Sequence, residues 1–216
     1  LKPACSEQVV RLPHCYQPND RQRRAAATPT RASQGLPEAG VVFCSFNNNY
    51  KITPEVFGLW MDILREVPGS VLWLYLRHAA AQDRLRREAH QRGVDPQRLV
   101  FATTLPHAEH LARYPLADLF LDTHPYNAHT TASDALWMGL PVLTRSGRTF
   151  ASRMAGSLLA AVSLALVGCA ASLLSLVRLL LAGLEFLIPH GQLGGPAQLG
   201  SRGGGCSNGG RGHGSA

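Results

Sequence analysis

Residues 122–141 read DTHPYNAHTTASDALWMGLP and directly follow the apolar run Leu119–Leu121. The apolar run is typical of a buried strand, and Thr130 and Thr131 are good N-cap residues for a helix over residues 132–138. A helix that starts just after a parallel strand presents unpaired N–H groups and its positive dipole end at the carboxyl edge of the sheet. This stretch therefore predicts a binding site for a phosphate-bearing, nucleotide-type ligand.

Around this stretch, from residue 40 to about residue 161, short apolar runs alternate with helical patterns. Such alternation is typical of an α/β protein with a doubly wound parallel sheet. The predicted strands are residues 41–46, 71–76, 99–101, 116–122 and 142–144. Three helices are predicted before residue 122. The first begins at Thr53-Pro54 and ends at Pro68-Gly69, and the other two span residues 80–92 and 107–113.

The flanking sequences differ in composition from this region. Residues 1–39 are Pro-rich or polar and aperiodic, so we expect a lead-in loop and linker there, with the α/β domain over residues 40–162. Residues 163–216 are a divergent apolar segment followed by a Gly-rich, low-complexity tail, which we expect to be helical or disordered. Residues 154–177 carry no charge and have the length of a membrane span. They are rich in Ala, Ser and Gly and continue the last predicted helix, so we favour a helix of the domain over a membrane span.

Charge and cysteine content narrow the class of protein. The 216 residues have a formal net charge of +7 and a pI near 9.6. The arginine clusters at 21–24 and 84–87 lack interleaved aromatic residues, which favours an anionic small molecule over nucleic acid as the partner. The five cysteines show no Cys-x-x-Cys spacing, which favours a reducing, cytoplasmic setting. The chain starts at Leu1 without a signal-peptide pattern, and we expect it to begin within a longer protein.

Several polar residues follow the predicted strands. Lys51 comes after Asn47-Asn48-Asn49 and just before a helix start, where its ammonium could stabilise charge on a leaving diphosphate. The alternative is a solvated loop lysine beside turn-forming asparagines, and the spacing alone leaves both open.

Histidines form a second candidate group. His107, His110 and Arg113 recur at helical spacing, and they are interpreted either as phosphate and base contacts or, with His124 and His129, as part of a zinc site. The first interpretation is the more economical, because no Glu or Cys stands at matching spacing. His129 stands directly before Thr130-Thr131, and it is either a capping-loop histidine bonded to the backbone or a diphosphate ligand. Asp134 is either a ribose ligand or a charge favoured by the helix dipole.

Together these motifs resemble the carboxyl-terminal catalytic lobe of the O-linked N-acetylglucosamine transferases, including bacterial and SPINDLY-like members. The resemblance covers roughly residues 10–162 in order and with near-constant spacing. Its main pieces are Leu12-Pro13-His14 with Tyr16, Phe46-Asn47 with Tyr50-Lys51, Ser70-Val71-Leu72-Trp73-Leu74, Glu109-His110, Leu121-Asp122-Thr123, Asn127-x-His129-Thr130-Thr131 with Asp134, Gly139-x-Pro141, and Ala151-Ser152-Arg153.

The resemblance implies a Rossmann-like lobe of a GT-B-type enzyme that transfers N-acetylglucosamine from its uridine diphosphate to Ser or Thr of proteins. Family members invert the sugar's configuration and use neither a metal nor a cofactor besides the donor. The resemblance also implies a role for each candidate residue. Lys51 contacts the diphosphate and assists its departure, with Asn48 beside it, and His129, Thr130 and Thr131 hold the diphosphate. Leu105 and His107 lie near the base, His110 and Arg113 line the nucleotide pocket, and Asp134 binds the ribose.

Some features depart from that family pattern. His107 stands where animal members tend to have Lys, and Asn48 replaces a common Gln. The amino-terminal lobe and the tetratricopeptide-like helical repeats of the family are not in this sequence, and similarity fades after about residue 162, which suggests a truncated or frame-altered end. Two alternatives therefore stay open: a guanosine diphosphate fucose donor, and an inactive nucleotide-binding remnant.

Overall fold

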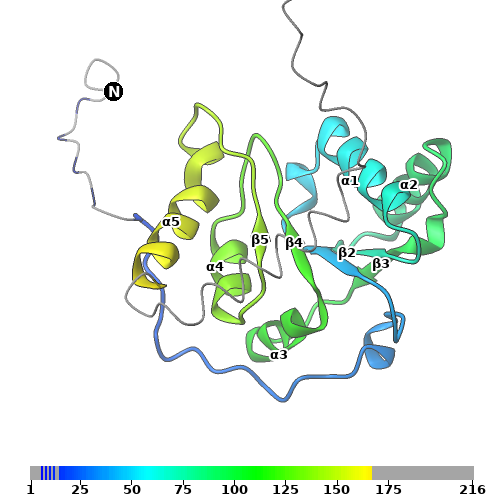
Figure 1. Ribbon diagram of the computed structural model, residues 1–216, viewed down its shortest axis with the longest axis horizontal. Helices are drawn as coiled ribbons and strands as arrows, with labels where there is room; N and C mark the ends of the chain where they lie inside the picture. Colours follow the sequence, from blue (N-terminus) through cyan, green and yellow to red (C-terminus); the bar gives the residue numbers. More distant parts are fainter. Residues whose placement is uncertain (1–5, 7, 9, 11, 13–14, 167–216) are drawn as a thin grey trace, which may run out of the picture.

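The computed structural model describes residues 6, 8, 10, 12 and 15–166. Its centre is a five-stranded parallel sheet with the strand order β3-β2-β1-β4-β5 (Figure 1). The strands are β1 (Val42–Ser45), β2 (Val71–Tyr75), β3 (Leu99–Ala102), β4 (Leu119–Leu121) and β5 (Val142–Leu143). The predicted α/β class and the five predicted strands are confirmed.

Helices cover both faces of the sheet, as a doubly wound fold requires. The helices α1 (Pro54–Glu66) and α2 (Ala79–Gln91) share one core cluster with Phe43 and Leu72. On the opposite face, α3 (His107–Arg113), α4 (Thr130–Trp137) and α5 (Met154–Leu166) enclose a second cluster around Cys44 and Phe120 (Figure 1). Adjacent strand residues such as Phe43 and Cys44 enter opposite clusters, because side chains alternate along a strand.

Short 3-10 helices fill several connections: η2 (Ala32–Gln34), η3 (Asn49–Lys51), η4 (Pro96–Arg98), η5 (Tyr114–Leu116) and η6 (Ala151–Arg153). The η5 turn explains why β4 is shorter than the strand predicted over residues 116–122. The Asp118 carboxylate between them accepts a hydrogen bond from the N–H of Val42 at 2.7 Å. The N–H of Asp118 in turn donates to the carbonyl of Val42 at 2.8 Å, so a side chain supplements the backbone ladder at this point.

The first helix begins and ends as its sequence predicts. The Thr53 hydroxyl accepts a hydrogen bond from the N–H of Val56 at 3.3 Å, and Pro54 occupies the first helical position. Trp60 and Leu64 lie on the buried face. Gly69 has a φ of +75°, which glycine adopts without strain, so the chain turns there into β2.

The start of α4 differs from its prediction. The helix begins at Thr130 and not at Ala132, with His129 in the N-cap position and no side-chain cap hydrogen bond. The hydroxyl of Thr131 donates instead to Oδ1 of Asn47 at 2.5 Å. The prediction that Thr130 and Thr131 are N-caps is therefore wrong, because the first turn is fixed by a tertiary contact to the end of β1.

The chain before the sheet follows the edge of the domain. The lead-in runs past α4 and α3 before it enters β1 (Figure 1), and the N–H of Ala26 donates to the carbonyl of Ala108 at 2.9 Å. The tail predicted from residue 163 lies outside the described residues beyond Leu166. In the part that the structure describes, no helix has the length and apolarity to cross a membrane.

Candidate functional site

The candidate site lies at the carboxyl edge of β1 and β4, the two neighbouring strands whose following helices cover opposite faces of the sheet. Lys51 follows β1 at the end of η3, and His129 follows β4 at the start of α4. A doubly wound sheet opens a crevice at such a point, and ligands bind there. The sequence therefore placed both residues at the correct edge.

Lys51 is a buried lysine, 8% exposed. Its Nζ donates a hydrogen bond to the carbonyl of Asn127 at 2.9 Å and lies 4.0 Å from the ring centre of Tyr126. Burial lowers the pKa of Lys51, while the nearby Asp122 opposes that shift. The interpretation of Lys51 as a solvated loop residue is wrong. Asn48 is exposed, and its carbonyl accepts the N–H of Lys51 at 3.0 Å.

His129 occupies the N-cap position of α4 and contacts aromatic rings. Its Nδ1 lies 2.8 Å from the hydroxyl oxygen of Tyr16, and its ring centre lies 5.3 Å from that of Tyr126. The Nε2 atom is buried and has no hydrogen-bond partner among the described residues. Burial and then the charge of Lys51 lower the pKa of His129, so its imidazole is neutral at pH 7.

The first turn of α4 offers further donors. The first intrahelical bond runs from the N–H of Ser133 to the carbonyl of His129 at 3.1 Å. The preceding amides, including those of Thr130 and Thr131, have no carbonyl within the helix to bind. The Thr130 hydroxyl is exposed and accepts a hydrogen bond from Nε2 of Gln17 at 3.2 Å. The predicted anion-binding helix start is thus at the predicted edge of the sheet.

Asp134 lies one turn further along α4 and is 3% exposed. Its Oδ1 accepts a hydrogen bond from Nη1 of Arg23 at 2.5 Å, and its Oδ2 lies 3.7 Å from Nε2 of His107. Burial raises the pKa of Asp134, while the charges of Arg23 and His107 counter that rise. The carboxylate predicted to bind ribose is thus already paired with a lead-in arginine.

The other predicted residues lie on α3 and the loop before it. His110 is surrounded by the rings of Phe46, Tyr75 and Tyr114, with ring centres 5.4, 6.3 and 5.2 Å away. Burial, then the charges of Arg113 and His107, lower the pKa of His110 to about 4. Arg113 is completely buried and donates through Nη1 to the carbonyl of Thr103 at 2.9 Å. Leu105 is half-buried and His107 is exposed.

Three buried polar residues form hydrogen bonds that link the segments at this edge of the sheet. They were not predicted as site residues. Asn47 donates through Nδ2 to Asp122 and Thr123, at 3.2 and 2.9 Å. Asp122 also accepts the N–H of Ala128 at 2.6 Å. Asn127 donates through Nδ2 to the carbonyl of Thr123 at 2.8 Å. The available signal was a polar residue directly after an apolar strand, which Asn47 and Asp122 both provide.

The zinc interpretation of the histidines gains no support. Within the described ranges, no group of three or more His, Cys, Asp or Glu side chains is placed to hold a metal ion. His107 instead faces Asp134, and His110 faces aromatic rings.

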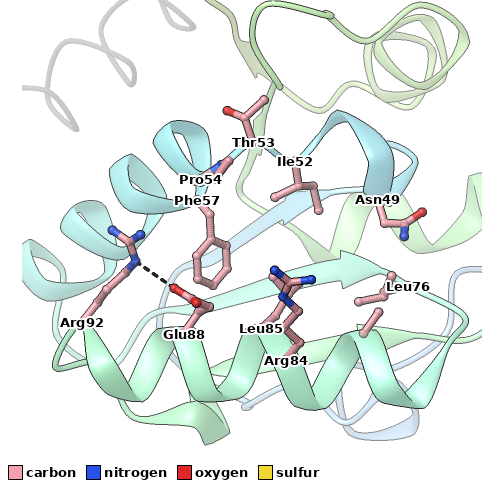
Figure 2. A pocket seen from close by; sticks show the side chains of 11 residues that line it. Asn49, Ile52, Thr53, Pro54, Phe57, Leu76, Arg84, Leu85, Glu88 and Arg92 are labelled. Carbon is pink, nitrogen blue, oxygen red and sulfur yellow. Dashed lines mark ion pairs between the residues drawn. The ribbon is translucent and has the colours of Figure 1, made fainter.

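A separate cavity of about 350 Å³ opens between α1 and α2, on the other face of the sheet. Figure 2 shows Phe57 projecting from α1, Leu85 projecting from α2, and the Glu88–Arg92 ion pair at one end. Asn49 lines this cavity and is the first residue of η3, the short helix that ends at Lys51. None of the predicted site residues lines this cavity, which is therefore separate from the candidate site.

The chain is similar to several known proteins. The model of glycosyl transferase family 41 matches residues 14–172. The chain is 41% identical to the probable UDP-N-acetylglucosamine–peptide N-acetylglucosaminyltransferase SEC of Arabidopsis thaliana, over 74% of this chain and 17% of that protein. It is 42% identical to the UDP-N-acetylglucosamine–peptide N-acetylglucosaminyltransferase of Caenorhabditis elegans, over 62% of this chain and 12% of that protein.

A solved structure is similar as well. A mutant O-GlcNAc transferase of Thermobaculum terrenum superposes with a TM-score of 0.60 at 36% identity, over 71% of this chain and 29% of that chain. The chain thus spans less than a third of this structure, and less than a fifth of the two curated relatives.

Proposed function

The chain belongs to glycosyl transferase family 41, and from this premise we propose that it is the donor-binding lobe of a protein O-N-acetylglucosaminyltransferase. In this proposal the lobe binds uridine diphosphate N-acetylglucosamine, and the sugar is transferred to Ser or Thr of an acceptor protein. The amino-terminal lobe and helical repeats of the full-length enzyme supply the acceptor side, and the enzyme works in the cytoplasm. The names of the relatives support this donor and acceptor class.

One observation carries the proposal: Lys51, His129 and the first turn of α4 meet at the β1–β4 edge. A diphosphate needs compensation of its negative charge, and a buried ammonium beside a helix N-terminus provides it. When the sugar leaves, charge develops on the diphosphate. A preorganised lysine stabilises that charge without further reorganisation.

We assign roles to the remaining predicted residues from their positions around Lys51, His129 and the first turn of α4. Thr130 and Thr131 contribute hydroxyl and amide groups to the diphosphate, and Asp134 accepts a ribose hydroxyl. Leu105, His107 and His110 lie beside the base, with Arg113 buried beneath them, and Asn48 flanks Lys51. Because the chain's own cationic and N–H groups meet the diphosphate, the proposed reaction uses no cofactor besides the donor.

Calorimetric titration of the full chain with uridine diphosphate tests this function. We expect saturable binding, and the Lys51→Ala or His129→Ala variant should bind about 10- to 100-fold more weakly, as the loss of a charge-assisted hydrogen bond predicts. The control is Arg87→Ala, which removes an exposed cation from α2 on the other face. Absence of binding by the unsubstituted chain would contradict the proposal.

Two further measurements decide between the alternatives. Competition of guanosine diphosphate against uridine diphosphate distinguishes a fucose donor from an N-acetylglucosamine donor. Incubation of the chain with labelled donor and an acceptor peptide distinguishes an active transferase from a binding lobe. Transfer requires donor and acceptor to be held together, so we expect binding without transfer when this polypeptide is assayed alone.

A further inference from the structure

The lead-in segment, residues 15–23, lies directly against the start of α4. Four of its side chains contact four residues at the start of that helix. The contacts are Tyr16 Oη with His129 Nδ1 at 2.8 Å, Gln17 Nε2 to Thr130 Oγ1 at 3.2 Å, Ser133 Oγ to Asn19 Oδ1 at 2.5 Å, and Arg23 Nη1 to Asp134 Oδ1 at 2.5 Å. Three of the helix residues contacted are ones to which we have assigned donor binding.

The contact with His129 has a specific chemical consequence. A neutral imidazole carries one proton, so one ring nitrogen donates a hydrogen bond and the other accepts one. To bind a phosphate oxygen, the nitrogen that meets the ligand must carry that proton. Which nitrogen carries it is set by the hydrogen bond that the other one makes.

The two ring nitrogens of His129 differ in their surroundings. Nδ1 faces the Tyr16 hydroxyl, whereas Nε2 is buried without a partner in the described part of the chain. If Tyr16 donates its O–H to Nδ1, the proton of the imidazole resides on Nε2. A buried N–H without a partner lowers stability, and a ligand oxygen that displaces the side chains covering Nε2 would supply the missing acceptor.

The Tyr16 ring is held in place for this role. Its centre lies 4.9 Å from that of Phe150 and 6.1 Å from that of His129. Desolvation is the largest cause that raises the pKa of Tyr16 above its usual value near 10. The hydroxyl therefore keeps its proton at neutral pH and can donate it in a hydrogen bond.

We propose that Tyr16 is a positioning residue of the donor site: its hydroxyl donates to Nδ1 of His129 and fixes the tautomer whose Nε2–H binds the diphosphate. The inference rests on the proposed function for the identity of the ligand, but the tautomer can be measured without any ligand. Tyr16 itself does not contact the donor. Its effect on binding passes through the imidazole.

Nitrogen NMR of the full chain, labelled with ¹⁵N-histidine, tests the tautomer directly. The unsubstituted chain should show His129 with a protonated Nε2 and an unprotonated Nδ1, assigned by the signal that disappears in His129→Gln. Tyr16→Phe keeps the ring and removes the hydroxyl, so its His129 signals should shift towards a mixture of both tautomers. A protonated Nδ1 in the unsubstituted chain, or identical spectra in Tyr16→Phe, would overturn the proposal.

Calorimetry with uridine diphosphate tests the consequence for binding. Tyr16→Phe should weaken binding about 3- to 10-fold, the effect of one net hydrogen bond, and should add no further loss in a His129→Ala background. The matched control is Tyr50→Phe, since Tyr50 is 67% exposed and its hydroxyl makes no hydrogen bond among the described residues. Equal or tighter binding by Tyr16→Phe would mean that Tyr16 only occupies the place of the ligand, and the proposal would fall. If the unsubstituted chain does not bind uridine diphosphate, the proposed function fails while the tautomer result stands.

Discussion

His110 shows how a single residue at this site responds to its surroundings. Its imidazole lies among three aromatic rings, and the cation Arg113 is its neighbour on the same helix. Both the loss of hydration and the nearby positive charge disfavour protonation. The folded protein therefore holds His110 in its neutral form, which suits the position beside an uncharged nucleotide base that we propose for it.

The shift of His110 predicts a pH dependence of stability. Its pKa falls from 6.5 to about 4 on folding, so between these values the unfolded chain binds a proton that the folded chain excludes. The stabilising contribution is fully present above pH 6.5 and is lost as the pH falls through 4. Urea unfolding from pH 7.5 to pH 4 should show a decline in the free energy of unfolding that is smaller in His110→Gln. His90→Gln, an exposed change on α2, should decline as the unsubstituted chain does. Parallel curves for all three proteins would contradict the prediction.

Single residues also show what the sequence could not predict. The position of Lys51 after a strand indicated the right edge of the sheet. Its burial could not be predicted, because it depends on Tyr126 and Asn127, which the β4–α4 connection supplies. The pairing of Asp134 with Arg23 joins residues 111 positions apart in the sequence, and no local pattern encodes such a contact.

At the scale of elements, the sequence predicted best where local signals and burial agree. The helix α1 has a threonine cap, a proline at its first position and an apolar stripe, and its start matches the prediction. The predicted start of α4 was wrong by two residues, because the Thr131 hydroxyl bonds to Asn47 and does not cap the helix. A helix start at a binding edge is shaped by tertiary contacts that propensity does not describe.

The end of α1 depends on an arginine from another element. Nε of Arg98, from η4, donates to the carbonyl of Ser70 at 2.7 Å, and its Nη2 donates to the carbonyls of Leu64 and Val67 at 2.6 and 2.8 Å. The last carbonyls of a helix lack partners within it. Arg98 therefore joins the α1–β2 turn to the entry of β3.

Removal of this side chain should destabilise the domain. We expect Arg98→Ala to lower the free energy of unfolding by about 2–4 kcal/mol, because it leaves part-buried carbonyls without a charged donor. Arg98→Lys should recover only part of the loss, since an ammonium cannot reproduce the guanidinium fork. Chemical denaturation measures both, with Arg87→Ala as an exposed arginine control. An effect of Arg98→Ala no larger than that of Arg87→Ala would show that the contacts do not stabilise the turn.

For the whole molecule, the important feature is that the lead-in is tied to the domain that follows it. Arg23 and Asp134 form a buried ion pair, with side chains 8% and 5% exposed, and the guanidinium lies 4.8 Å from the ring centre of Trp137. The family match begins at residue 14, so it includes this segment. The composition of residues 1–39 indicated a loop and gave no sign of these contacts.

A double-mutant cycle on this pair measures how strongly the lead-in holds to α4. Arg23→Ala leaves the Asp134 carboxylate buried without its main partner, so we expect a loss of about 3–5 kcal/mol in the free energy of unfolding. Asp134→Asn removes the uncompensated charge, so Arg23→Ala combined with Asp134→Asn should be clearly more stable than Arg23→Ala alone. Arg24→Ala, an exposed change at the adjacent position, should stay within about 0.5 kcal/mol of the unsubstituted chain. If the Arg23→Ala and Arg24→Ala variants unfold at the same denaturant concentration, the lead-in is held by its other contacts, and the ion pair has no part in joining it to the sheet.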